Sequence, residues 1–383
     1  LLALLLHEIT GLDQSSCVII SGVFVGLYTV VGGIDAVIWT DVIQTIILAS
    51  GSLICLVVII AALPNGLNDI FEIANAHNKF SLGAIVNGEL IPPSWQFDLG
   101  SKTGTMIFII GITFFLTEYA ASQHMVQRYC AASSVREARK GMLFTALFSM
   151  PTWFFYMFLG TALFVFFTVH PQPEVAAMLD GTSKSEQVVP YFVLNYLPAG
   201  VAGLVIAAAI AAGMSSLDSS INAVSTVTVV DIYRRHLYKG KNDRHYLLVA
   251  KLTALCTTVL MILGALALFR FDTKTLQDTS IILTSLVSGG MLGLFCLGLL
   301  TTKGDSRSVW SGIISTLLFT LWTILLQKNV LPESLSAPFD LYYTSTLANF
   351  VLFVVAYSLG LLLPAAEKKD LRNLTVWTMD SKT

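Results

Sequence analysis

Long apolar runs, separated by short polar stretches, dominate the pattern of this 383-residue chain. Nine of them approach or exceed the roughly 20 residues that an α-helix needs to cross a bilayer. They lie at about 15–33, 37–62, 104–126, 140–167, 199–230, 246–269, 279–301, 307–326 and 344–364. The pattern predicts an all-α membrane protein with about nine full transmembrane helices, residues 1–364 forming a single transmembrane domain.

Composition supports this class and excludes others. Hydrophobic residues make up 55% of the chain and charged residues 12%, and the mean hydropathy is +0.75. Soluble domains carry about a quarter charged residues. A net charge of −2 provides no basic field for nucleic acid. The sequence contains no HExxH, GxSxG or Walker-type motif, so we do not expect an enzyme.

The chain starts with the apolar stretch Leu1–Leu6, without an initiator methionine or a basic region. It is therefore no signal peptide. We interpret it as the end of a helix and the chain as N-terminally truncated.

Lysine and arginine fix the predicted orientation, because loops rich in these residues stay in the cytoplasm. Fifteen of the 22 fall after alternate runs or in the tail: Arg128, Arg136, Arg139, Lys140, Arg234, Arg235, Lys239, Lys241, Arg244, Lys303, Arg307, Lys368, Lys369, Arg372 and Lys382. We therefore expect a multi-pass protein of the cell membrane, plasma or inner, with residues 365–383 as a short cytoplasmic tail.

The fifth run carries a cluster of side-chain oxygens within an otherwise apolar segment: Ser215, Ser216, Asp218, Ser219, Ser220 and Asn222. A carboxylate among hydroxyls in a spanning helix is costly unless something partners it. A small hard cation is the natural partner, because hard cations prefer oxygen ligands. Helical spacing places Ala212, Ser215, Ser216 and Ser219 on one face. Close helix packing is the alternative, since small and hydroxyl residues also serve that purpose.

Two further carboxylates stand out. Asp41 begins the second run at a depth similar to that of Asp218, so both could hold one ion, although Asp41 could equally cap its helix. Glu118 lies near the middle of the third run, where an ionisable residue indicates a functional site by default. A protonated Glu118 bonded to a neighbouring helix is the alternative. Gly289–Gly290 could break a helix at midplane, as in transporters.

Three passages carry a resemblance to a known family. They are YTVVGGIDAVIWTDVIQ at Tyr28–Gln44, SQHMVQRYCAASSVREARKG at Ser122–Gly141, and AAGMSSLDSSINAVSTVTVVDIYRR at Ala211–Arg235. In these the chain resembles the sodium/solute symporter family, which includes sodium-coupled sugar, monocarboxylate, vitamin and sialic acid transporters. The resemblance implies a LeuT-type inverted-repeat core that lacks its first helices, with Leu1–Gly11 ending the third.

The resemblance also assigns residues. It implies a sodium site at Ala212, Ser215 and Ser216, and a second sodium site at Asp41, Asp218 and Ser219, together with Ser215. Members with the second site tend to have a hydroxyl where this chain has Asp218. Substrate contacts are implied near Glu118, Tyr119 and Ser122.

These expectations combine into one functional prediction. We expect a sodium-driven symporter that imports a small organic solute, such as a sugar, sialic acid or carboxylate, by alternating access. Its partners are the solute, Na⁺ and the lipid bilayer, with no nucleic acid. The alternative is a transporter-like sensory module that reports solute to a cytoplasmic partner.

Overall fold

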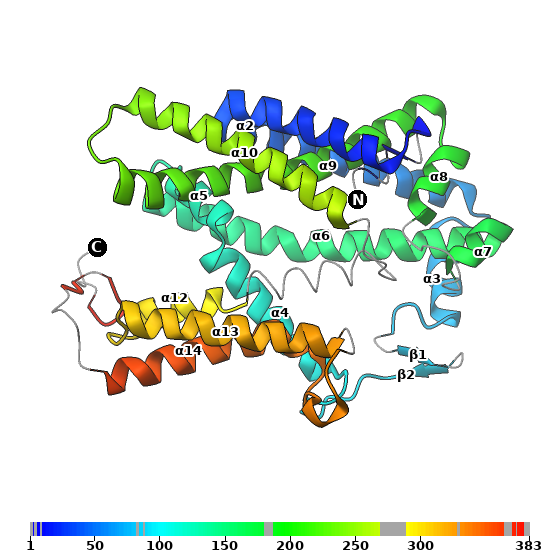
Figure 1. Cartoon of the computed structure of the whole chain (residues 1–383). Helices are drawn as coiled ribbons and strands as arrows, with labels where there is room; N and C mark the ends of the chain where they lie inside the picture. Colours follow the sequence, from blue (N-terminus) through cyan, green and yellow to red (C-terminus); the bar gives the residue numbers. More distant parts are fainter. Residues whose placement is uncertain are drawn as a thin grey trace. The chain divides into compact units, whose positions relative to one another are not determined.

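The computed structural model of the chain is almost entirely helical (Figure 1). It describes residues 3, 6, 7, 10–81, 84–86, 89–179, 187–268, 289–327, 330–363, 370–372 and 374–378. The chain divides into two compact units, Leu1–Ser81 with Gln127–Asp272 and Leu82–Val126 with Thr273–Thr383. Each unit is described by itself below.

The first unit contains the longest helices of the chain. Its elements are α2 (Gln14–Ala62), α3 (Leu67–Ala76), α6 (Val135–Val169), α7 (Pro173–Leu179), α8 (Val188–Tyr196), α9 (Ala199–Thr226), the π-helix η3 (Val227–Leu237) and α10 (Asp243–Leu268). Polar residues start two of them. Asp13 accepts the backbone N–H of Ser16 at the start of α2, and Ser134 accepts that of Glu137 at the start of α6.

Helix α2 contains two of the predicted spans in one element. Gly33 interrupts its helical dihedrals with φ 61° and ψ −157°. Only glycine adopts this region without steric cost, so the chain can bend there and continue as a second helical segment. Gly33 thus divides the predicted runs 15–33 and 37–62.

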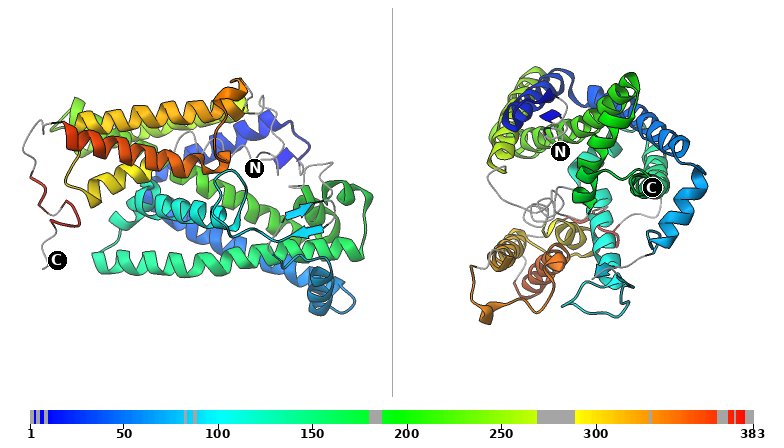
Figure 2. Two further views of the ribbon diagram at one scale, coloured as in Figure 1. Left: turned by 90° about the horizontal axis from the view of Figure 1, so that it is seen from below. Right: turned by 90° about the vertical axis from the view of Figure 1, so that its right-hand side faces the viewer.

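Helices α2, α9 and α10 pack along one another, as Figures 1 and 2 show. Glycines on α2 permit the approach. A Cβ at Gly26 would overlap the side chain of Thr258 on α10, and one at Gly51 would lie 3.3 Å from Cβ of Ala208 on α9. Such contacts through small residues are typical of membrane helices. They bring the polar part of α9 against α2.

An aromatic core closes one end of this unit. Phe166 of α6 lies 5.1 Å from Phe192 and 4.9 Å from Tyr196 of α8, measured between ring centroids. Both phenylalanines are buried. Helix α3 covers the same cluster through Ile70, which is fully buried. This short helix therefore belongs to a packed core.

The second unit contains shorter elements. They are the strands β1 (Ala84–Val86) and β2 (Glu89–Ile91), which pair antiparallel with Ala84 opposite Ile91, the helix α4 (Gly104–Leu116), the π-helix η1 (Thr117–Ala121), α12 (Met291–Leu300), α13 (Ser306–Gln327), the 3₁₀ turns η4 (Glu333–Leu335) and η5 (Leu341–Tyr343), and α14 (Thr344–Leu362). Helix α5 (Gln123–Cys130) runs across the boundary between the units.

Helices α12, α13 and α14 form a small bundle (Figures 1 and 2). The backbone N–H of Gly293 on α12 donates to the side-chain oxygen of Asn349 on α14, at 3.0 Å. Gly290 has φ 94° directly before α12, so this glycine begins a helix. The other half of the predicted helix break, before Gly289, lies outside the described residues. Tail residue Trp377 donates to the carbonyl of Leu300 at the end of α12.

The predicted continuous span 104–126 is wrong in detail. The helix changes from α to π geometry at Thr117 and stops at Ser122, whose φ of −71° and ψ of 126° are extended. At the break the Ser122 hydroxyl donates to the side chain of Glu118 at 3.1 Å. The break puts Glu118, Tyr119 and Ser122 at an interrupted helix.

Seven helices in the described part of the chain are long and apolar enough to cross a membrane. One of them, α2, holds two predicted spans, and the predicted span 279–301 lies partly outside the described residues. Their outer faces are apolar: on α6, for example, Phe148 and Phe154 are 65% and 75% exposed. Such continuous apolar surface suits contact with lipid. The predicted helix end at Leu1–Gly11 lies mostly outside the described residues.

Candidate functional site

Helix α9 presents its oxygen cluster to two different surroundings within the first unit. Ser215, Asp218 and Ser219 belong to a hydrogen-bonded network with α2, whereas Ala212 and Ser216 border a cavity. This division follows from helical geometry, because Ser216 projects about 100° away from Ser215. The five residues assigned to sodium from the sequence on α9 therefore lie together, but they do not all face one point.

Asp41 is the centre of the network. The hydroxyl of Ser215 donates to Oδ1 of Asp41 at 2.5 Å, and Nη2 of Arg128 lies 2.6 Å from Oδ2. The same guanidinium nitrogen donates to Oγ of Ser219 at 2.8 Å. Asp41 lies well inside the continuous second segment of α2, so the sequence-based alternative of a helix cap is not what the structure shows.

Arg128 therefore supplies a positive charge between two of the residues predicted to bind a second sodium ion. It comes from the last turn of α5, and the side chains of Arg128 and Asp41 are only 28% and 19% exposed. Its position is supported by the neighbouring Gln127, whose Nε2 donates to Oγ1 of Thr226 on α9 at 3.0 Å. The 2.6 Å bond between Arg128 and Asp41 is partly buried and charge-assisted, and such bonds are among the stronger interactions in proteins.

Asp218 is fully buried, and its hydrogen-bond partners differ from those of Asp41. The hydroxyl of Tyr28 on α2 donates to Oδ2 of Asp218 at 2.6 Å, and the Ser219 hydroxyl lies 3.3 Å from Oδ1. Gln44 lies beside the Tyr28 hydroxyl, and its buried Oε1 has no hydrogen-bond partner among the residues that the structure describes. The network thus holds two carboxylates against one guanidinium, and it leaves an acceptor oxygen that a cation could use.

A cavity of about 460 Å³ lies on the other side of α9. Helices α2, α9 and α10 line it, with Ala212 and Ser216 among the α9 residues. The Ser216 hydroxyl donates a 3.5 Å hydrogen bond to the carbonyl oxygen of Ala212, and both oxygens keep lone pairs that a cation can use. Hard cations such as calcium bind oxygen at about 2.3–2.6 Å, so two oxygens at this separation can share one ion. The pair has the donor chemistry that a small hard cation requires.

The predicted substrate residues lie in the second unit, around the end of η1. Oε1 of Glu118 is 2.7 Å from Nε2 of His124, and its Oε2 accepts the Ser122 hydroxyl at 3.1 Å. The Tyr119 ring stacks on Phe115, with 5.9 Å between centroids. Glu118 is about one-third exposed, so its carboxylate can be reached by a polar solute. The structure brings all three residues together at the helix break.

Two members of the network were missed from the sequence. Arg128 counted only as a loop charge that fixes orientation, and Tyr28 as the start of a motif. A signal existed for both, because each lies inside one of the three passages that carry the resemblance. Composition and spacing alone do not show that these residues meet on α9, which lies about 90 and 190 positions away along the chain.

Comparison with known proteins identifies the class to which this chain belongs, a family of membrane transporters. Residues 2–316 match the profile of the Sodium:solute symporter family, so the chain belongs to that family. Sodium is a co-substrate in this family. The family is one of transporters, which confirms the prediction that the chain is not an enzyme.

The chain is 29% identical over 325 residues to the sodium/sialic acid symporter NanT of Aliivibrio fischeri, covering 84% of this chain and 61% of that protein. It is 27% identical to a sodium/glucose cotransporter of Vibrio parahaemolyticus, covering 93% and 64%. Mouse sodium-coupled monocarboxylate transporter 1 is 30% identical, over 84% of this chain and 50% of that protein. The chain thus spans between half and two-thirds of the length of these relatives.

The fold also matches a solved structure, that of a Na⁺-coupled sialic acid symporter in a substrate-bound, outward-open state. The TM-score is 0.76 at 24% sequence identity, and the match covers 95% of this chain and 70% of that one. At this identity the match shows the fold. It confirms the predicted multi-helix LeuT-type core, of which the chain covers a part.

Proposed function

We propose that this chain contributes the ion-binding part of a symporter that uses sodium entry to import a small organic solute. Its relatives carry names that specify sialic acid, glucose and monocarboxylates, so the solute class proposed here is a sugar, sialic acid or carboxylate. The observation that carries the proposal is the oxygen pair of Ala212 and Ser216 beside the cavity of about 460 Å³.

The first sodium ion is proposed to bind at Ala212, Ser215 and Ser216. Ala212 and Ser216 line the cavity, and the neighbouring Ser215 donates a 2.5 Å hydrogen bond to Asp41. The hydroxyl of Ser215 keeps acceptor lone pairs while it donates to Asp41. A nearby carboxylate then lowers the electrostatic energy of a bound cation without touching it.

At the second cluster, Arg128 is proposed to compete with sodium. Its guanidinium contacts Asp41 and Ser219, two of the residues that would bind the second ion. Asp218 adds a second negative charge in place of the hydroxyl that the family tends to have, so the cluster keeps a net charge of −1 when Arg128 is present. Sodium binding there requires the guanidinium to withdraw or the ion to share the site with it.

The solute is proposed to bind at the interrupted helix of the second unit. Glu118 and Ser122 offer polar groups, and the stacked ring of Tyr119 offers an apolar face, which is the mixture that small polar solutes need. A broken helix supports this role, because transporters use such breaks to expose backbone groups at the binding site. The cytoplasmic location of the C-terminus is also part of the proposal, from the positive-inside rule.

The ion gradient provides enough free energy for this function. One sodium ion moving through ~100 mV releases about 2.3 kcal/mol, and a tenfold concentration gradient adds roughly 1.4 kcal/mol. Together these support accumulation of a neutral solute on the order of several hundredfold.

Uptake into vesicles tests the proposal. The protein is reconstituted, and uptake of labelled sialic acid, glucose and a monocarboxylate is followed with a sodium gradient or with choline in place of sodium. We expect one solute to accumulate only with sodium, and unlabelled solute of that class to compete. Equal uptake with choline for every transported solute contradicts sodium coupling. A sensory module would bind solute without accumulating it.

A further inference from the structure

Helix α10 carries a mixed basic and apolar face at its N-terminal end. Arg244, Leu247, Leu248 and Lys251 occur at intervals of three, four and seven residues, so they share one face of the helix. Leu247 and Leu248 are 57% and 58% exposed. With Asn242 and His245 these side chains line a surface groove of about 430 Å³.

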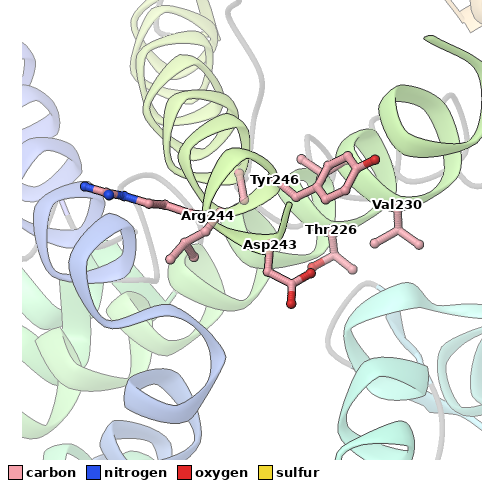
Figure 3. A pocket seen from close by; sticks show the side chains of 8 residues that line it. Thr226, Val230, Asp243, Arg244 and Tyr246 are labelled. Atoms are coloured by element: carbon pink, nitrogen blue, oxygen red, sulfur yellow. The ribbon is translucent and has the colours of Figure 1, made fainter. Parts of the chain in front are cut away.

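The lining of this groove combines basic side chains with no acidic side chain among the residues that the structure describes. In the described part of the chain neither Arg244 nor Lys251 makes an ion pair. The segment 234–251 contains six lysines and arginines but a single carboxylate, Asp243. Figure 3 shows the neighbouring pocket, which Arg244 also lines, and there the Arg244 side chain extends away from Asp243 and Thr226. The groove therefore offers two cationic groups to an external anion.

The depth of these residues suits a bilayer interface. Helix α10 has 26 residues and is apolar enough to span a membrane. Its length of about 39 Å exceeds the roughly 30 Å hydrocarbon core, so its first turns extend into the headgroup region. Lys251 lies about 10 Å along the axis from Arg244, and its long side chain can reach back to the interface.

We propose that this groove, lined by Arg244, Leu247, Leu248 and Lys251, binds an anionic phospholipid. The two cations pair with the headgroup phosphate, and the exposed leucines contact the acyl chains. Charge complementarity favours an anionic lipid over a zwitterionic one, because each basic residue near a membrane surface adds favourable attraction to anionic lipids. The apolar lining favours a lipid over free phosphate, which would gain nothing from leucine.

Native mass spectrometry of the purified protein tests the proposal with phosphatidylglycerol as the probe. We expect phosphatidylglycerol to stay bound at concentrations at which phosphatidylcholine does not. The double variant Arg244→Gln/Lys251→Gln should weaken that binding on the order of thirtyfold. The matched control Arg136→Gln/Arg139→Gln removes two exposed cations from α6 and should bind lipid as the unaltered protein does.

Two results would overturn the proposal. One is equal phosphatidylglycerol binding by the double variant and the control. The other is displacement of the lipid by inorganic phosphate alone, which would make the groove a general anion site. If the double variant fails to fold, Arg244→Lys/Lys251→Arg retains both charges and must keep the lipid, and loss of binding in that variant also contradicts the proposal.

Discussion

Replacing Arg128 by glutamine should make the stability of this protein more dependent on sodium. The substitution removes the guanidinium that lies 2.6 Å from Asp41 and 2.8 Å from Ser219. Among the described residues it leaves Asp41 and the fully buried Asp218 without a cation in their network. Sodium is the ion best suited to take that place if the cluster is the second ion site.

The size of the effect follows from burial. Breaking a buried ion pair costs about 3–5 kcal/mol, and an exposed pair contributes at most about 1 kcal/mol. With side chains 28% and 19% exposed, we expect a loss of roughly 2 kcal/mol in sodium-free buffer. Sodium at tenfold excess over its Kd would restore about 1.4 kcal/mol.

Thermal unfolding in detergent, followed by intrinsic fluorescence, measures this effect. Sodium chloride is compared with choline chloride at equal ionic strength, which removes general screening as a cause. Arg128→Gln should show a larger rise of Tm with sodium than the unaltered protein. Arg372→Gln is the control, because its ion pair with Asp370 is exposed on both sides. An equal sodium-dependent rise in all three proteins would refute the competition between Arg128 and sodium.

Two other substitutions have expected outcomes that equilibrium unfolding can check. Tyr28→Phe removes the hydroxyl that donates to buried Asp218 and should lower the free energy of unfolding by about 1.5–3 kcal/mol. The control Tyr156→Phe loses a neutral hydrogen bond to a serine and should lower it by about 0.5–1.5 kcal/mol. Equal losses in the two variants would contradict a charged partner for Tyr28. Gly293→Ala places a Cβ against a backbone carbonyl of α14 and should lower the free energy of unfolding by about 1–3 kcal/mol. The control Gly298→Ala on the same helix places its Cβ in open space. An unchanged stability of Gly293→Ala would show that α12 and α14 do not pack this closely.

The apolar runs predicted the class and most helices, because spanning segments must be long, apolar and internally hydrogen-bonded. The break after Glu118 was not predicted. Hydropathy averages over some 20 residues, and a change from α to π geometry at Thr117 does not alter it. The bend at Gly33 likewise depends on one backbone dihedral, which a glycine permits but does not require.

The candidate site was predictable in part. A carboxylate among hydroxyls on α9 indicated a cation from residue chemistry alone, and Asp41 followed from depth along the neighbouring run. The partners of Asp218 and Asp41 were not predictable, because Tyr28 and Arg128 reach α9 through tertiary packing over a large sequence separation. The residue types predict an ion at α9, which stays a prediction, and the fold determines which charged groups meet.

Binding of radioactive sodium to the purified protein tests the central claim most directly. The unaltered protein is compared with Ser216→Ala and with the control Ser225→Ala. Ser225 is not among the residues that line the cavity, and its hydroxyl donates to the Ala250 carbonyl on α10. Loss of an oxygen ligand should weaken sodium binding on the order of tenfold or more in Ser216→Ala and leave Ser225→Ala unchanged. Equal sodium affinity in Ser216→Ala and the unaltered protein would contradict the proposed ion site on α9.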